Sequence, residues 1–366
     1  WDDLWLNESF ANMMEYEAVN AIFPEWEVWD SFINHEGLSA LRRDATPGVQ
    51  SVKQAVNHPD EISTLFDHSI VYAKGGRLLY MLKNYVGEDA FRKGLTDYFK
   101  RHSYKNTSGS DLWDALSEAS GSDVGAFMDP WLTRSGFPVI KVRQKGKELA
   151  LRQEHFLDNP EKSDPGRVWP VPLFASDKNV PKLLTRKDTS CVLSSDEYVR
   201  VNQGALGHYI VDYDSPRHRE AIIGLLRQGK LDNPERLMLL NDASMLARAG
   251  YQCYGSVLKM LEAYSDETSE SVWEMISLII GETRRFIDLD EGLEAKIKRL
   301  VRGLVATEYK RLGWTEKTGE PAADTKLRAT IVGLGTYAED PEIISKGKKL
   351  FEAYRKDPSS VATELR

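Results

Sequence analysis

Glu8 stands in a segment rich in tryptophan near the start of the chain, Trp1-Asp-Asp-Leu-Trp-Leu-Asn-Glu8-Ser-Phe-Ala11. A glutamate in the first turn of a helix is favoured by the helix dipole and needs no function. Its setting suggests more, because apolar neighbours are expected to shield it, and a shielded carboxylate is costly unless it binds a cation or a donor. These neighbours are Trp1, Trp5, Leu6 and Phe10. Glu8 is therefore a candidate metal ligand.

Tyr72 lies in a second segment of interest, Phe66-Asp67-His-Ser-Ile-Val-Tyr72-Ala-Lys74-Gly75-Gly76. A tyrosine in an apolar helix is most simply a core residue with its hydroxyl satisfied. Paired glycines cost helix stability and permit close approach of backbone or ligand, although they equally fit close helix packing. A phenol beside a reaction centre could donate a hydrogen bond to a developing oxyanion. Tyr72 is therefore a candidate catalytic residue.

The histidines do not complete a metal site. No two of them have the helical spacing of four residues, so a His-Glu-x-x-His motif is absent. They are His35, His58, His68, His102, His155, His208 and His218. Each is expected to be a surface or loop residue. The chain by itself cannot supply the three protein ligands of a catalytic zinc site.

The composition is that of a soluble globular protein, and 366 residues suggest two or three domains. A net charge of −8 without a basic cluster argues against a nucleic-acid surface. No apolar run approaches the roughly 18 residues of a membrane span. Cys191 and Cys253 are too few for a thiol metal site or a disulfide framework and fit a reducing cytoplasm. The chain opens without Met or a signal-peptide pattern, so it is expected to begin inside a folded domain.

Hydrophobic spacing changes character twice, which predicts three parts. Residues 1–136 have a helical pattern, and Asn7 is expected to cap a helix that ends near Val19. Residues 137–214 alternate with a period of two and predict a small antiparallel β-sandwich. Residues 215–366 predict a stacked α-helical array that is incomplete at its C-terminal end.

The predicted elements follow from the same patterns. In the first part, helices are predicted from Pro24, over 70–85 and 88–102, and around Leu112 and Phe127. In the second part, strands are predicted at 139–144, 148–156, 168–174, 191–193, 198–201 and 208–213. In the third part, helices are predicted at 217–228, 233–250, 254–265, 268–287, 291–313, 322–338 and 341–356.

The two candidate segments together resemble one family. The first resembles the segment after the zinc-binding helix in the aminopeptidase N family of gluzincin metallopeptidases. In that family a His-Glu-x-x-His motif is followed, after 18 residues, by the glutamate that is the third zinc ligand, and Glu8 falls on it. The segment Tyr72-x-Lys74-Gly75 is similar to the one that carries the family's catalytic tyrosine, and Asp67 fits at five residues before it.

The resemblance continues along the chain. The segment from Phe127 to Val139 resembles the junction between catalytic domain and sandwich, and the segment from Asn241 to Ala247 is like the start of the C-terminal helical domain. Three segments look most like the lactic-acid-bacterial members, which are cytoplasmic peptidases of broad specificity: Arg42-Arg43-Asp44, Gly48–Val52 and Ile70–Gly75. The implied fold is the helical C-terminal part of a thermolysin-like catalytic domain, followed by a β-sandwich and a helical array.

The resemblance implies a zinc aminopeptidase, a hydrolase that releases N-terminal amino acids from peptides. It assigns Glu8 as a metal ligand, places it near the free amine of the substrate, and assigns Tyr72 as the donor to the oxyanion. It implies one zinc ion in the intact enzyme, which this chain is not expected to bind alone. The chain departs from the pattern at Ser9, where the family usually has Gly. It also lacks the two histidines, the general-base glutamate and the Gly-x-Met-Glu-Asn motif.

We therefore expect an internal fragment that is inactive alone, from a cytoplasmic enzyme that acts on peptides, binds neither nucleic acid nor membrane, and is a monomer. Two other classes stay open. One is a non-enzymatic helical scaffold in which 215–366 binds a protein partner. The other is a carboxylate-pair hydrolase that uses Asp2, Asp3 or Glu8 beside the tryptophans, as glycosidases do.

Overall fold

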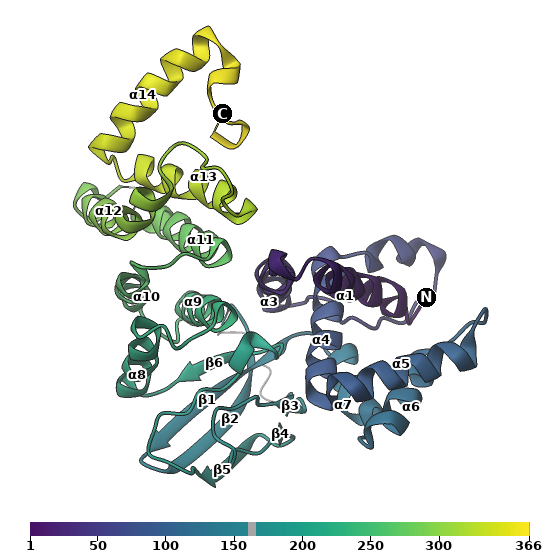
Figure 1. The fold of residues 1–366 in the computed structure, drawn as a ribbon. Coiled ribbons are helices and arrows are strands. Elements are labelled where there is room, and N and C mark those ends of the chain that lie inside the picture. Colours follow the sequence, from purple (N-terminus) through teal and green to yellow (C-terminus); the bar gives the residue numbers. More distant parts are fainter. Residues whose placement is uncertain (160–165, 288, 366) are drawn as a thin grey trace. The chain divides into compact units, whose positions relative to one another are not determined.

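The computed structural model describes residues 1–159, 166–287 and 289–365, which form two compact units (Figure 1). One unit comprises residues 1–222 and 245–251, and the other comprises residues 223–244 and 252–366. The fold is mainly helical with a small mixed sheet. The division into three parts at 136 and 214 stays a prediction.

The first unit begins with helices. They are α1 (Trp5–Ile22), η1 (Pro24–Trp26), α2 (Val28–Ser31), η2 (Phe32–Gly37), α3 (Leu38–Asp44), η3 (Pro59–Leu65), η4 (His68–Lys74), α4 (Gly75–Val86), α5 (Glu88–His102), α6 (Gly109–Ser120) and α7 (Val124–Thr133). Both η2 and η4 are π-helical and continue directly into α3 and α4. The predicted helix α5 is confirmed. At the start of α6 the Asp111 carboxylate accepts from the Ser108 N–H, and Asp123 caps α7 by accepting from the Ala126 N–H.

The start of α1 corrects one prediction. The helix begins at Trp5 and ends at Ile22, so Asn7 lies inside it and is not the cap. Trp5 is anchored by packing, because its ring stacks on Trp113 with centroids 5.0 Å apart. Its indole N–H also donates to Asp3 Oδ1 over 2.9 Å. This tertiary contact begins the helix earlier than the local capping pattern suggests.

The sheet of the first unit is mixed, where an antiparallel arrangement was expected. Its strands are β1 (Phe137–Lys145), β2 (Glu148–Phe156), β5 (Asp188–Val192) and β6 (Ile210–Tyr213), in the order β5-β2-β1-β6. β1 and β2 form an antiparallel hairpin, whereas β6 pairs parallel with β1. Two short strands, β3 (Val171–Pro172) and β4 (Leu183–Leu184), form a separate pair.

The strand predicted at 198–201 is wrong. The backbone N–H of Val199 donates to Gln144 Oε1 over 2.9 Å, and that of Arg200 donates to Ser176 Oγ over 2.9 Å. Side chains thus satisfy backbone groups that a strand ladder would otherwise pair.

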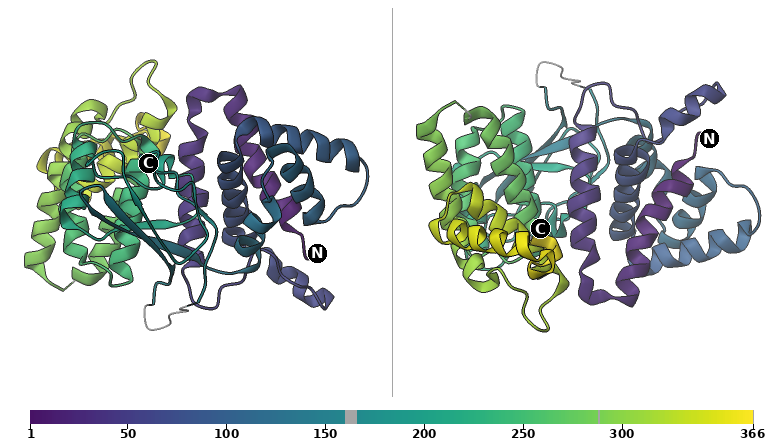
Figure 2. Two further views of the ribbon diagram at one scale, coloured as in Figure 1. Left: turned by 90° about the horizontal axis from the view of Figure 1, so that it is seen from below. Right: turned by 90° about the horizontal axis from the view of Figure 1, so that it is seen from above.

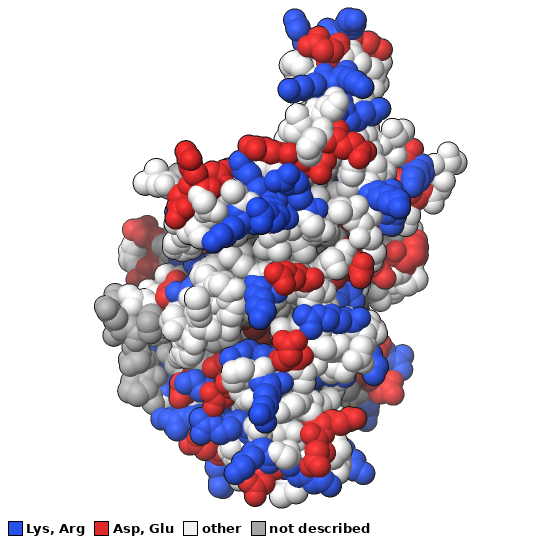
Figure 3. Space-filling model, turned by 90° about the vertical axis from the view of Figure 1, so that its left-hand side faces the viewer, with Lys and Arg blue, Asp and Glu red and all other residues white. Residues whose placement is uncertain are grey.

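Residues beyond the sheet are helical, and the seven predicted helices are confirmed. They are α8 (Pro216–Arg227), α9 (Asn233–Arg248), α10 (Tyr254–Leu261), α11 (Glu270–Ile287), α12 (Glu291–Leu312), α13 (Ala322–Tyr337) and α14 (Pro341–Lys356), with short turns η6 (Glu262–Tyr264), η7 (Pro358–Ser360) and η8 (Thr363–Leu365). Lys and Arg are interspersed with Asp and Glu over the face drawn in Figure 3. Within the three described ranges, no helix has the length and apolar character that crossing a membrane requires.

Candidate functional site

The structure brings Glu8 and Tyr72 together. Glu8 lies in the first turn of α1 and Tyr72 lies in η4, and both side chains are half-buried. The pKa of Tyr72 is raised by burial, and further by its hydrogen bond to Glu8 and by the Glu8 charge. The ring of His68 stacks on that of Tyr72, with centroids 5.6 Å apart. A carboxylate and a phenol thus lie side by side.

Close packing of α1 against η4 and α4 fixes this pair (Figure 2). The hydroxyl of Ser9, next to Glu8, donates to the carbonyl of Val71 over 2.5 Å, and both residues are buried. A Cβ added at Gly75 would lie 1.9 Å from Ser9 Oγ, and one added at Gly76 would lie 2.5 Å from Asn12 Oδ1. The glycines are therefore required for helix packing, which was one of their two sequence interpretations.

The predicted shield of aromatic residues around Glu8 is incomplete. Trp1 is 64% exposed, and Trp5 is buried against Trp113. The neighbouring aspartates have structural roles. Asp3 accepts hydrogen bonds from Trp5 and from the N–H of Gly109, and Asp2 accepts one from the N–H of Val56. These roles argue against a carboxylate-pair hydrolase.

Two histidines contradict the expectation of surface positions. His208 and His218 are completely buried. His218 Nε2 donates to the Val199 carbonyl over 2.8 Å. His208 Nε2 lies 3.3 Å from Asp44 Oδ2, and burial lowers the His208 pKa to about 4, so its ring is neutral at neutral pH. Within the described residues, no group of three His, Cys, Asp or Glu side chains could hold a metal ion.

A buried ion pair close to Tyr72 escaped the sequence interpretation. Lys74 Nζ lies 2.9 Å from Asp44 Oδ2, and both side chains are completely buried. Burial alone would raise the pKa of Asp44, but the charge of Lys74 and the hydrogen bond from His208 lower it to about 2. Lys74 belongs to the Tyr-x-Lys-Gly segment and Asp44 to the Arg-Arg-Asp segment, but nothing in their spacing joins them.

Asp67 begins the segment that carries Tyr72. Its carboxylate accepts a hydrogen bond from the N–H of Ser69 over 3.0 Å and caps η4. It also accepts one from Arg43 Nε over 3.0 Å. Asp67 therefore positions the start of η4, at five residues before the tyrosine.

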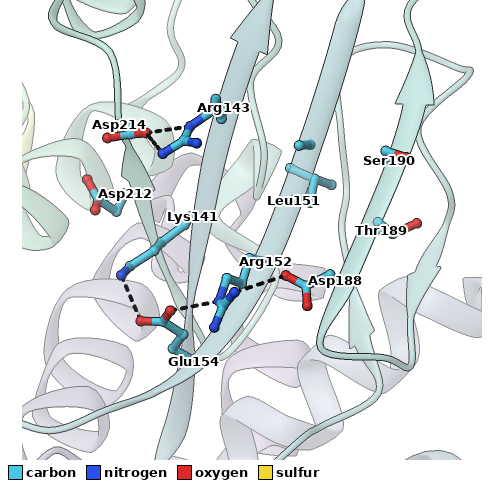
Figure 4. A pocket seen from close by; sticks show the side chains of 11 residues that line it. Lys141, Arg143, Leu151, Arg152, Glu154, Asp188, Thr189, Ser190, Asp212 and Asp214 are labelled. Carbon is cyan, nitrogen blue, oxygen red and sulfur yellow. Dashed lines mark hydrogen bonds and ion pairs between the residues drawn. The ribbon is translucent and has the colours of Figure 1, made fainter.

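The open face of the sheet forms a separate pocket of about 690 Å³ (Figure 4). Its charged side chains pair with one another. Glu154 lies 2.7 Å from Lys141 and 2.8 Å from Arg152, and Asp214 lies 2.7 Å from Arg143. The Lys141–Glu154 pair joins β1 to β2, whereas Arg152 and Glu154 both lie on β2. Three basic and four acidic side chains line the pocket, so neither sign of charge dominates it.

Family comparisons agree with this architecture. Residues 1–131 match the Peptidase family M1 domain, and residues 198–366 match the ERAP1-like C-terminal domain. The chain thus combines a segment of a peptidase-family domain with a C-terminal domain of the ERAP1-like kind. The chain belongs to the peptidase M1 family, that of zinc aminopeptidase N, and the predicted family is confirmed.

Several relatives match this chain over its full length or nearly so. Aminopeptidase N of Lactococcus lactis subsp. lactis (strain IL1403) is 40% identical over 374 residues, which cover 100% of this chain and 44% of the relative. Aminopeptidase N of Lactobacillus helveticus is 36% identical, with the same coverage. Aminopeptidase 2 of Candida albicans is 34% identical, over 97% of this chain and 39% of the relative. The chain thus spans less than half the length of these relatives.

Proposed function

We propose that this chain is part of a zinc-dependent aminopeptidase that releases N-terminal amino acids from peptides. The observation that carries the proposal is the contact of Glu8 with Tyr72, in a chain that belongs to the peptidase M1 family. A non-enzymatic scaffold is not favoured, because the matching relatives are named aminopeptidases.

Glu8 fits the role of a metal ligand in its chemistry. Its carboxylate is half-exposed, contacts the Tyr72 hydroxyl, and forms no ion pair within the described residues. A carboxylate oxygen is an accepted zinc ligand, and the remaining ligands would come from outside these residues. When bound, zinc would supply the Lewis acidity that polarises a scissile carbonyl and activates water.

Tyr72 would act as a hydrogen-bond donor. A phenol is protonated at neutral pH, as donation to an oxyanion requires, and burial and the contact with Glu8 raise the pKa of Tyr72 further. Such a contact is typically worth about 2.7–4 kcal/mol at the transition state. The negative charge of Glu8 would also favour the protonated amine of a peptide substrate nearby.

The finer parts of the proposal rest on the family resemblance. We infer that 1–136 is the helical part of a thermolysin-like catalytic domain, 137–214 a β-sandwich domain and 215–366 a helical array. The enzyme would be a cytoplasmic monomer that binds one zinc ion and neither nucleic acid nor membrane. The chain 1–366 would be inactive alone, because it lacks two zinc ligands and the general base.

Two measurements test the proposal. Purified 1–366 with added zinc should not hydrolyse an aminoacyl chromogenic substrate beyond a buffer control, whereas the full-length protein should. In the full-length protein, Tyr72→Phe should lower kcat by about 10²–10³-fold with little change in KM. Hydrolysis by 1–366, or full activity of Tyr72→Phe, would contradict the proposal.

A further inference from the structure

Two consecutive residues of α3 hold the two ends of η4. Arg43 pairs with Asp67 over 3.0 Å at the first end, and Asp44 pairs with Lys74 over 2.9 Å at the second end. Tyr72 lies between these ends. The Arg43 pair is partly exposed to solvent and so contributes little. The buried pair therefore has the stronger influence on η4.

The hydrogen bonds of the buried pair are directional. Lys74 Nζ donates to the carbonyls of Arg134 and Gly136, over 3.2 and 3.3 Å, in addition to its contact with Asp44. Asp44 Oδ1 accepts from the Gly136 N–H over 2.8 Å, and Oδ2 faces His208. The last turn of η4 is thereby tied to α3, to the residues before β1 and to those before β6.

Residues in the next turns of the helix, within α4, also bond to the segment before β6. Arg77 donates to the carbonyls of Ala205 and Gly207, and Met81 Sδ accepts from the His208 N–H over 3.5 Å. Together with Lys74, these residues have the spacing of one helix face. Tyr72 instead contacts Glu8 of α1. The Lys74 face thus sets the rotation of the helix, and the rotation determines where Tyr72 points.

The energetics favour a positional role. A buried ion pair adds little net stability, because desolvation offsets its attraction, and apolar residues of similar volume often stabilise a fold as well. What the pair supplies is a fixed direction for each hydrogen bond. A misplacement of about 1 Å in a catalytic group can cost about 10²-fold in rate.

We propose that Asp44 and Lys74 are positioning residues for Tyr72, which fix η4 so that the tyrosine hydroxyl stays beside Glu8. Both side chains are completely buried, so neither is accessible to a substrate. The inference rests on the proposed function, since it is the catalytic use of Tyr72 that gives its position a consequence.

The test is a double-mutant cycle in the full-length zinc-loaded enzyme. Lys74→Met should lower kcat by about 30–100-fold with less than about 3-fold change in KM. Because Lys74 acts through Tyr72, it should add less than about 3-fold in a Tyr72→Phe background. Lys83→Met is the matched control, as Lys83 pairs with Glu17 over 2.8 Å on α4 of the same unit. It should leave kcat within about 3-fold of wild type.

A double variant and a hydrogen-exchange measurement complete the test. The variant Asp44→Leu/Lys74→Met removes both charges together, so no uncompensated buried charge threatens folding, and it should reproduce the Lys74→Met kinetics. Hydrogen exchange needs no activity: in metal-free wild type, amides of 68–75 should be protected like those of α4, and Lys74→Met should accelerate them selectively.

The outcomes separate the two proposals. Full activity of Tyr72→Phe defeats the catalytic assignment itself. If that assignment stands, the inference is overturned when the losses from Lys74→Met and Tyr72→Phe multiply. It is equally overturned when Lys83→Met matches Lys74→Met, or when amides 68–75 exchange freely in wild type.

Discussion

The contact between Gly75 and Ser9 gives a quantitative test of how α1 approaches η4 and α4. In most helices Gly→Ala stabilises, by about 0.8–1.0 kcal/mol. At Gly75, however, the new Cβ would lie 1.9 Å from Ser9 Oγ and 2.6 Å from Ser9 Cβ. Either the hydroxyl leaves the Val71 carbonyl or α1 moves outward.

Both responses cost free energy. Overpacking a closed core costs about 1–3 kcal/mol, and losing the Ser9–Val71 hydrogen bond costs about 0.5–1.5 kcal/mol. After the gain in helix propensity, Gly75→Ala should lower the free energy of unfolding by roughly 1–3 kcal/mol. Ser9→Gly should recover much of this loss in the double variant, because it removes both atoms that the new methyl group meets.

Urea denaturation followed by tryptophan fluorescence measures these differences. Gly125→Ala in α7 is the control, since its Cβ would find only ordinary contacts at 3.7 and 4.0 Å. That variant should be neutral or slightly stabilised. The reasoning is refuted if Gly75→Ala is as stable as wild type, or if Ser9→Gly gives no recovery.

Three other predictions concern buried polar groups. His208 has a pKa of about 4 when folded and its ordinary 6.5 when unfolded, so its contribution to stability is complete above pH 6.5 and is lost as the pH falls toward 4. His208→Phe should flatten urea midpoints between pH 7 and 4, and an unchanged pH dependence would contradict this. Glu267→Ala should cost about 3–5 kcal/mol, measured by denaturant unfolding, because Arg236 at 2.7 Å loses its carboxylate partner; Glu267→Gln also removes the charge and should cost nearly as much, and a negligible cost of Glu267→Gln would argue against a charge effect. Asp3→Ala should cost about 1–3 kcal/mol and lower the Tm, because the Trp5 indole and the Gly109 N–H lose their acceptor; an unchanged Tm would show that these bonds are not needed.

Local patterns predicted much of the helical architecture. The seven helices after the sheet were predictable because most of them are amphipathic and lie between polar turns, and α5 has the predicted bounds at Glu88 and His102. Local patterns failed where contacts between residues far apart in the sequence determine the structure. Trp5 extends α1 by stacking on Trp113, and β6 pairs parallel with β1 although hairpin-like alternation suggested antiparallel neighbours.

The site shows the same limit. Glu8 and Tyr72 could be predicted as candidate site residues because each lies in a contiguous motif. Lys74 finds its partners in α3 and in the turn before β1, and Asp44 contacts His208 in the segment before β6, so no local spacing joins these residues. The burial of His208 could not be predicted from local patterns either, because its partner Asp44 lies 164 residues away.

The long sequence separation between these hydrogen-bond partners affects when the protein can fold during its synthesis. The carbonyl of Gly207, which accepts from Arg77, follows it by 130 residues. At about 5–20 residues per second, a ribosome needs roughly 10 s to supply this acceptor. Until then the nascent helical region would have to bury Lys74 and Arg77 without the acceptors at 134–136 and 205–207, which is unfavourable. Its core should therefore close late, together with the sheet, so the helical region and the strands that follow it mature as one folding unit.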